Sequence, residues 1–131
     1  MGGCMKNLIQ GDLTSQVLEV FFHVYNVLGY GFLEKVYENA LLLSLKKKGL
    51  SPARQVQLSV VFEGEPVGVY FADIIVNEKV IVEIKASETI HTSNEAQLLN
   101  YLKATNIEVG LLLNFGKKPQ FKRKFFTNNF K

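Results

Sequence analysis

The sequence predicts an α/β fold in which a mixed β-sheet is flanked by helices. Two stretches rich in β-branched and aromatic residues, 67–76 and 80–84, are separated by Asn77-Glu78-Lys79 and predict a β-hairpin. A strand ahead of them would complete an antiparallel three-stranded meander. The continuous apolar run 109–115 is typical of a buried strand. A right-handed crossover through the helix before it would set this strand parallel to residues 80–84.

A single domain is expected over residues 1–131. A chain of 131 residues can bury about two thirds of its unfolded surface in one core. Residues 1–14 are interpreted as a flexible leader, since residues 1–10 lack the long apolar core of a secretory signal. The only cysteine is Cys4, which favours a reducing, cytoplasmic setting. No apolar run approaches the ~20 residues of a membrane span, so no membrane partner is expected.

Two amphipathic helices are expected ahead of the sheet. The first spans residues 15–28 and ends at Gly29, which tolerates the left-handed backbone of a helix terminus. The second spans residues 32–48, with Gly31 as its N-cap and Gly49 after its last turn. The core faces are expected to comprise Val17, Phe21, Val24 and Leu28 in the first helix and Val36, Tyr37, Ala40, Leu41, Ser44 and Leu45 in the second.

The elements on either side of the hairpin follow from similar patterns. Residues 55–63 alternate between polar and apolar side chains and predict the first strand of the meander, with a turn at residues 63–66. After the hairpin, residues 86–91 lead to a helix that Thr92 and Glu95 could cap reciprocally. This helix provides the crossover to the last predicted strand.

Three charged residues interrupt the apolar pattern of the hairpin. Asp73 lies in its first strand, and Glu83 and Lys85 lie in the second. A charged group among Phe, Ile and Val is costly to desolvate unless it is paired or bound to a metal ion. Glu83 and Lys85 are two residues apart and share one face of their strand. The three-residue loop 77–79 permits Asp73 to pair directly opposite Glu83.

The chemistry of these side chains favours a hard metal ion. Two carboxylates a few ångströms apart repel strongly unless a divalent cation lies between them. Oxygen ligands with no His or Cys nearby suit Mg²⁺ or Mn²⁺ better than Zn²⁺. A lysine beside the two acids would be held in its charged form.

The spacing D-x9-E-x-K formed by Asp73, Glu83 and Lys85 resembles the pattern of the PD-(D/E)XK nuclease superfamily. The proline of that pattern is absent, because Ala72 precedes Asp73. Three further blocks, GFLEKVYENAL, EAQLLNYLKAT and VGLLLNFG, are similar in content and order to the GxxExxY family of that superfamily. The resemblance covers roughly residues 17–116, most of the chain.

The resemblance implies a restriction-endonuclease-like fold and a nuclease that hydrolyses phosphodiester bonds, with DNA as the favoured substrate. Asp73 and Glu83 would hold Mg²⁺ or Mn²⁺, and the carbonyl of Ile84 could be a further ligand. Lys85 would orient or deprotonate the attacking water and stabilise the developing charge. Metal coordination lowers the pKa of bound water and polarises the phosphate, so few other groups are needed.

Glu34 and Gln97 are secondary catalytic candidates. With Gly31 as N-cap, Glu34 occupies the third helical position, where free N–H groups and the helix dipole favour a carboxylate without any catalytic role. The resemblance instead directs Glu34 toward the active site, where it could ligate a metal or orient water. Gln97 is either a surface glutamine or the counterpart of the glutamine that many superfamily members place near the water or the phosphate.

Basic charge is concentrated in the C-terminal segment 117–131. This segment contains six basic residues and no acid, whereas residues 1–116 contain nine basic and twelve acidic residues. Cations interleaved with aromatic side chains suit phosphate contact and base stacking. An amphipathic edge strand with a solvated basic face is the alternative. The candidate nucleic-acid-binding residues are Lys117, Lys118, Lys122, Arg123 and Lys124.

The sequence is also compatible with two other functions. The chain could be a non-catalytic nucleic-acid or protein binding module that retains the nuclease fold. Alternatively, Asp73 or Glu83 could pair with Lys85 in a purely structural ion cluster that serves a homodimer or a partner subunit.

Overall fold

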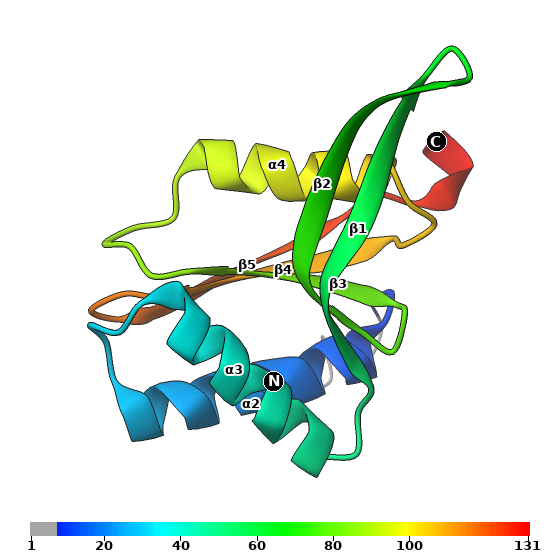
Figure 1. Ribbon diagram of the computed structural model, residues 1–131. Coiled ribbons are helices and arrows are strands. Elements are labelled where there is room, and N and C mark those ends of the chain that lie inside the picture. Colours follow the sequence, from blue (N-terminus) through cyan, green and yellow to red (C-terminus); the bar gives the residue numbers. More distant parts are fainter. Residues whose placement is uncertain (1–7) are drawn as a thin grey trace.

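The computed structural model describes residues 8–131, whose helices and strands form three layers (Figure 1). In chain order the elements are α2 (Gly11–Leu28), α3 (Glu34–Lys47), β1 (Pro52–Phe62), β2 (Glu65–Val76), β3 (Val80–Lys85), α4 (Thr92–Lys103), β4 (Val109–Phe115), β5 (Pro119–Phe125) and the 3-10 helix η1 (Asn128–Phe130). A five-stranded sheet with the order β1-β2-β3-β4-β5 forms the middle layer. Helices α2 and α3 cover one face, and α4 covers the other (Figure 1).

The predicted mixed sheet is confirmed. β1, β2 and β3 form the antiparallel meander, and β4 lies parallel to β3 after the crossover through α4. Every residue of β4 is buried, because helices cover both faces of the central parallel pair. β5 adds an antiparallel edge strand beside β4, so much of the basic segment 117–131 is part of the sheet.

The start of α2 differs from the expectation. The helix begins at Gly11, so residues 11–14, which were expected in a flexible leader, form its first turn. Leu13 is buried there, and the Thr14 hydroxyl donates to the Gly11 carbonyl at 3.1 Å. Burial of this turn against the core stabilises it as helix. Residues 1–7 of the expected leader lie outside the described residues.

The start of α3 also differs, and the difference changes the setting of Glu34. The N-cap is Leu33 and not Gly31, so Glu34 occupies the first helical position instead of the third. Glu34 therefore cannot form a capping box, in which a glutamate at the third helical position accepts the backbone N–H of the N-cap residue. The core face is rotated as well, since Val36 is 39% exposed whereas Glu38 is only 5% exposed. The rotation turns a carboxylate toward the sheet.

Most of the helix positions expected in the core are buried there. Val17, Phe21, Val24, Tyr37, Leu41 and Leu45 are buried, whereas Leu28, Ala40 and Ser44 are half-buried. The Tyr37 ring stacks on Phe115 with centroids 4.1 Å apart, and its hydroxyl donates to the Gly29 carbonyl at 2.7 Å. Tyr37 thus ties the loop between α2 and α3 to the sheet. Within residues 8–131, no helix combines the length and apolar character needed to cross a bilayer.

The N-terminus of α4 is capped by residues other than those expected. His91 is the N-cap, and its backbone N–H donates to Asn94 Oδ1 at 3.3 Å. The expected reciprocal pair of Thr92 and Glu95 does not form. Glu95 instead accepts from the Lys124 ammonium at 2.7 Å, because β5 brings that cation close to the first turn of the helix.

β1 and β2 extend beyond the sheet as a two-stranded ribbon (Figure 1). β1 pairs with β2 over nearly its whole length, whereas β2 pairs with β3 only at Ile74, Ile75 and Val76. β2 therefore separates from β3 at Asp73. The charged residues of the hairpin lie at and beyond this point of separation.

Candidate active site

Asp73 and Glu83 face each other where β2 separates from β3. Ile74 and Val82 are the last paired residues, so Asp73 and Glu83 occupy the next position on each strand. There, hydrogen bonds between carboxylate side chains and backbone N–H groups take the place of backbone–backbone hydrogen bonds. Glu83 Oε2 accepts the Asp73 N–H at 2.9 Å, and Asp73 Oδ2 accepts the Ile84 N–H at 2.8 Å. The three-residue loop thus brings the two carboxylates together, as its length predicted.

Both carboxylates have raised pKa values. The pKa of Glu83 is raised to about 8, first because the side chain is buried and then because Asp73 carries a like charge. Burial is also the main cause of the raised pKa of Asp73, and the Ile84 N–H is the largest influence in the opposite direction. The metal-free pair therefore holds a proton near neutral pH.

The residues of this pair fit a hard divalent cation. Asp73 Oδ1 and Glu83 Oε1 are the carboxylate oxygens that the backbone N–H groups leave unused. In the part of the chain that is described, no group of three or more His, Cys, Asp and Glu side chains is placed to hold a metal ion. The donor set is two carboxylates, to which the Ile84 carbonyl could add a third oxygen. Mg²⁺ is often bound through one or two carboxylates, with water and phosphate oxygens completing its coordination.

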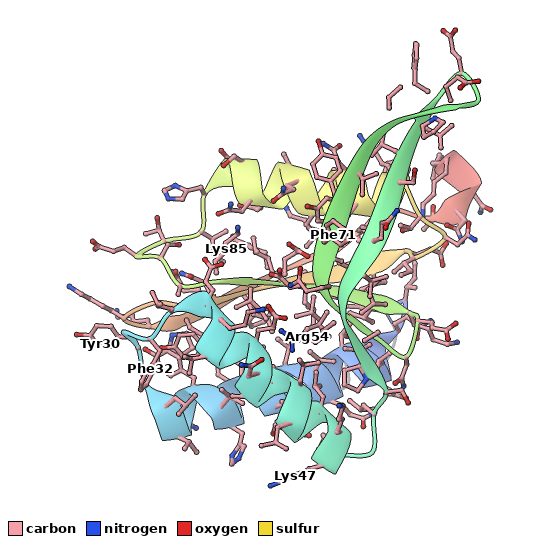
Figure 2. The ribbon with its side chains drawn as sticks, viewed as in Figure 1. Tyr30, Phe32, Lys47, Arg54, Phe71 and Lys85 are labelled. Carbon is pink, nitrogen blue, oxygen red and sulfur yellow. The ribbon has the colours of Figure 1, made fainter. Side chains whose placement is uncertain are left out.

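Lys85 lies on the same face of β3 as Glu83, between the sheet and α4 (Figure 2). Its charge lowers the pKa of both Asp73 and Glu83. No carboxylate among residues 8–131 lies within ion-pair distance of its ammonium group. The lysine therefore contributes a positive field at the site without being bound to either acid.

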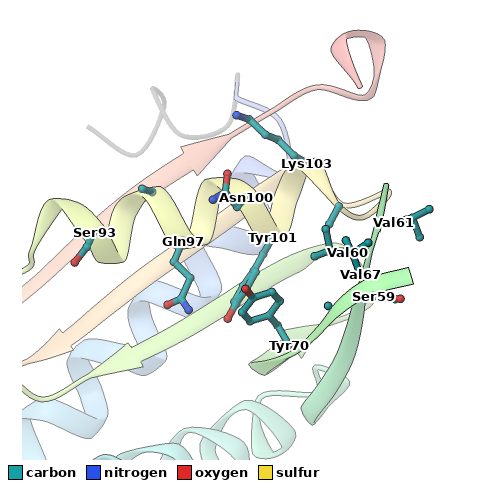
Figure 3. Close-up of a pocket in the computed structure, with 13 residues that line it drawn as sticks. Ser59, Val60, Val61, Val67, Tyr70, Ser93, Gln97, Asn100, Tyr101 and Lys103 are labelled. Carbon is teal, nitrogen blue, oxygen red and sulfur yellow. The ribbon is translucent and has the colours of Figure 1, made fainter. Parts of the chain in front are cut away.

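Glu34 and Gln97 approach from different helices. Glu34 is exposed in the first turn of α3, and its charge raises the pKa of Glu83, so the two carboxylates lie within electrostatic range. Gln97 is half-buried on α4 and lines a groove between α4 and the ribbon (Figure 3). Neither side chain is hydrogen-bonded to Asp73 or Glu83 within the described residues.

Tyr101 is a residue near the site that the sequence patterns did not single out. It lies on α4 and is 6% exposed. Its pKa is raised to about 12, first by burial and then by the charges of Glu83 and Asp73. The hydroxyl therefore remains protonated and can donate a hydrogen bond beside the two acids.

Glu38 is a second unanticipated residue, and it lies behind Asp73. Its buried carboxylate faces three polar partners from neighbouring elements. Arg54 Nη2 lies 3.4 Å from Glu38 Oε2, and Lys35 Nζ lies 3.8 Å from the same oxygen. The Gln55 amide donates to both carboxylate oxygens, at 3.2 and 3.3 Å. These partners offset the cost of burying the charge.

Gln55 connects this buried carboxylate to the site. Its Nε2 lies 3.5 Å from Asp73 Oδ1 as well as within hydrogen-bond distance of Glu38. The Gln55 backbone has φ of 48°, a left-handed conformation that disfavours most L-residues. The strand is thus distorted at the residue whose amide lies between the two acids. Glu38 falls within a block that resembles the GxxExxY family, but Gln55 carries no pattern that distinguishes it from a surface strand residue.

The candidate nucleic-acid-binding residues of β5 fall into two groups. Lys124 is paired with Glu95, and the half-buried Arg123 guanidinium donates to the Ile9 carbonyl. Lys117, Lys118 and Lys122 are exposed, and within residues 8–131 their ammonium groups have no ion pair or hydrogen bond. The second group keeps its charge available to solvent.

Comparison with known proteins identifies one matching family and one solved structure with a similar fold. The family model described as the PD-(D/E)XK nuclease superfamily matches residues 11–124, from α2 into β5. No curated protein is significantly similar to the chain. The crystal structure of SSO0001 superposes with a TM-score of 0.56 at 20% sequence identity. The superposition covers 71% of this chain and 50% of SSO0001, so the chain spans half the length of that protein and shares its fold.

Proposed function

The chain belongs to the PD-(D/E)XK nuclease superfamily, and from this premise we propose that it is a metal-dependent nuclease that hydrolyses phosphodiester bonds of DNA. The observation that supports the proposal most directly is the convergence of Asp73 and Glu83, with Lys85 on the same face of β3. Superfamily members generally use divalent metal ions. Within the superfamily we assign the chain to the GxxExxY family, on the sequence blocks described above.

In this proposal Asp73 and Glu83 hold Mg²⁺ or Mn²⁺ through the oxygens left free by the backbone, and the Ile84 carbonyl is a further ligand. When bound, the ion would lower the pKa of a coordinated water and polarise the phosphate. The raised pKa of Glu83 means that metal binding must displace a proton. Metal affinity is therefore expected to increase with pH up to about pH 8.

Lys85 is assigned the role of orienting or deprotonating the attacking water and stabilising the developing charge. The absence of an ion pair to Asp73 or Glu83 among the described residues supports this role, since the ammonium can donate to a phosphate oxygen or a water. Glu34 and Gln97 are assigned supporting roles, Glu34 toward the metal or its water and Gln97 toward the substrate.

Backbone phosphates are proposed to contact the exposed lysines of the basic segment. Lys117, Lys118 and Lys122 support this assignment best, because their exposed ammonium groups form no ion pair with another described residue. Arg123 and Lys124 support it less, because each already has a partner within the protein.

The proposal is tested by titrating Mn²⁺ into the wild type and into Asp73→Ala by calorimetry, and by assaying both for cleavage. The cleavage assay covers single-stranded, duplex, flapped and branched DNA, with RNA of the same forms. We expect metal binding and cleavage of at least one DNA form by the wild type, and neither by Asp73→Ala. RNA cleavage without DNA cleavage would contradict the substrate assignment.

The two other functions predict different outcomes of the same experiment. A binding module would cleave none of the substrates, and a binding assay on the same substrates would show wild type and Asp73→Ala binding equally well. A structural ion cluster would show no metal binding in the wild type, and Asp73→Ala would mainly lower its stability. Either result would contradict the nuclease proposal.

A further inference from the structure

A groove of about 810 Å³ runs between the β1–β2 ribbon and α4 (Figure 3). The ribbon wall is largely apolar and includes Val60, Val67 and Tyr70. The wall formed by α4 is polar and includes the side-chain amides of Gln97 and Asn100. The volume lies within the ~300–1,000 Å³ range of pockets that enclose small organic molecules. The groove therefore offers an apolar surface opposite hydrogen-bonding groups.

The groove adjoins the pair of carboxylates. Tyr101 lines it and packs in the same apolar cluster as Ala72, the residue before Asp73. Burial, and then the charges of Asp73 and Glu83, raise the pKa of Tyr101. The rings of Tyr70 and Tyr101 have centroids 5.7 Å apart and are tilted by 48°. Tyr70 is 46% exposed, so part of its ring remains open to a ligand in the groove. An aromatic surface thus lies beside the site where the phosphate is proposed to react.

The charge of the groove lining is compatible with a phosphate group bound next to the groove. No acidic residue lines it, and Lys103 is its one charged lining residue within residues 8–131. The Lys103 ammonium lies over the Phe126 ring, 5.5 Å from its centroid. A nucleobase combines an apolar face with hydrogen-bonding edges, so the two walls match it in chemistry.

We propose that this groove binds an unpaired nucleotide of the strand being cleaved, with its base against Tyr70 and its edge toward Gln97 and Asn100. The inference rests on the proposed function, since it places the phosphate of that strand at Asp73 and Glu83. A base must leave the duplex stack before its face can lie on a protein ring. The substrate class is therefore a single-stranded segment, either free or next to a duplex.

The test is binding of a labelled single-stranded thymidine oligonucleotide, measured by fluorescence anisotropy in EDTA, beside a duplex of the same length. We expect Tyr70→Ala to weaken single-strand binding about 10-fold or more, because stacking supplies much of such affinity. Tyr70→Phe keeps the ring and should bind within about 2-fold of the wild type. Duplex affinity should be the same in all three proteins.

An acidic substitution supplies a second, matched comparison. Val67 on the groove wall is 61% exposed and Val27 on α2, outside the groove, is 69% exposed, so neither change to Asp removes a buried contact. Both variants have the same net charge. We expect Val67→Asp to weaken single-strand binding more than Val27→Asp does.

The inference is overturned if Tyr70→Ala binds the single strand like the wild type, or if it weakens single-strand and duplex binding equally. Equal effects of Val67→Asp and Val27→Asp would also overturn it. Because these binding measurements are made without metal, they test the groove independently of metal-dependent cleavage. If Tyr70→Ala cleaves and binds like the wild type, the groove proposal fails and the nuclease proposal stands. If binding depends on Tyr70 but the wild type cleaves no substrate, the nuclease proposal fails and the groove proposal stands.

Discussion

Lys85 lies within electrostatic range of Asp73 and Glu83 but is not paired with either carboxylate. We predict that Lys85→Met retains Mn²⁺ affinity, because a competing cation has been removed from beside the ligands. Cleavage should be at least ~100-fold slower, since loss of a positioned base or charge stabiliser typically has that effect. Calorimetry and single-turnover cleavage measure the two quantities on the same preparation.

Asp73→Ala serves as the control for contaminating nuclease in that experiment. If Lys85 is only a counter-charge, Lys85→Met should instead destabilise the metal-free protein, and added metal should restore its stability. Wild-type cleavage by Lys85→Met, with Asp73→Ala inactive, would rule out the catalytic role of the lysine.

Gln55 is expected to position Asp73, because its amide lies between that carboxylate and the buried Glu38. We predict that Gln55→Ala lowers Mn²⁺ affinity about 10- to 100-fold, the usual effect of losing a group that orients a ligand. Gln57→Ala is the matched control, since Gln57 is exposed on the same strand two residues away. Calorimetry of both variants gives the comparison.

A second substitution at the same position separates the amide from the backbone. Gly tolerates the left-handed conformation that Gln55 adopts, so Gln55→Gly removes the amide and also relieves the strain. It should lose metal affinity as Gln55→Ala does. Wild-type affinity in Gln55→Gly would show that backbone strain, and not the amide, accounts for any effect of Gln55→Ala.

At the scale of elements, β5 combines an edge strand with a basic surface. Deleting residues 117–131 would remove this strand and expose β4, so substitution is the appropriate test of its charge. We predict that changing Lys117, Lys118 and Lys122 together to Gln weakens nucleic-acid binding. The slope of log affinity against log salt should fall by up to about 3 units, roughly 0.9 for each lost phosphate contact.

A matched triple variant controls for net charge. Lys46, Lys47 and Lys79 are exposed, and Lys47 is well separated from Lys85 in Figure 2. Their change to Gln removes the same total charge from other surfaces. If both triple variants shift the salt slope equally, the effect belongs to the overall charge and β5 is not a phosphate-binding element.

The stability of the whole molecule should depend on pH through Glu83. Its folded pKa is about 8, raised from 4.5. The folded state therefore keeps a proton that the unfolded state releases between these values, and its contribution to stability is fully present below pH 4.5 and is lost as pH rises through 8. The free energy of unfolding of the metal-free protein should fall by at most roughly 1.4 kcal/mol per pH unit on account of this group.

Urea unfolding in EDTA at about pH 5 and about pH 8 measures this effect when wild type is compared with Glu83→Gln. The variant lacks the titrating group, so the difference in its stability between the two conditions should be smaller or reversed. Added Mn²⁺ should stabilise the wild type more at the higher pH, because it binds the deprotonated site. An identical pH dependence in the two proteins would contradict the raised pKa.

Local patterns were sufficient for most of the architecture. The strands 67–76 and 80–84, the three-residue loop and the apolar run 109–115 specify a hairpin and a buried parallel strand, and each feature depends on neighbouring residues. Element boundaries were less accurate. The N-cap positions of α3 and α4 were wrong, because the Tyr37 hydroxyl accepts the Phe32 N–H ahead of α3, and Asn94 accepts the N–H of His91 ahead of α4.

The sequence alone determined the fold class and brought Asp73, Glu83 and Lys85 to the place where β2 separates from β3, since the hairpin register is a local property. Only the tertiary structure revealed Glu38, Gln55 and Tyr101 near Asp73 and Glu83. These side chains come from α3, β1 and α4, and their meeting depends on long-range packing that no periodicity encodes. The same packing engages Arg123 and Lys124 while leaving other cations of the segment exposed, because charge composition does not specify which neighbours a folded chain supplies.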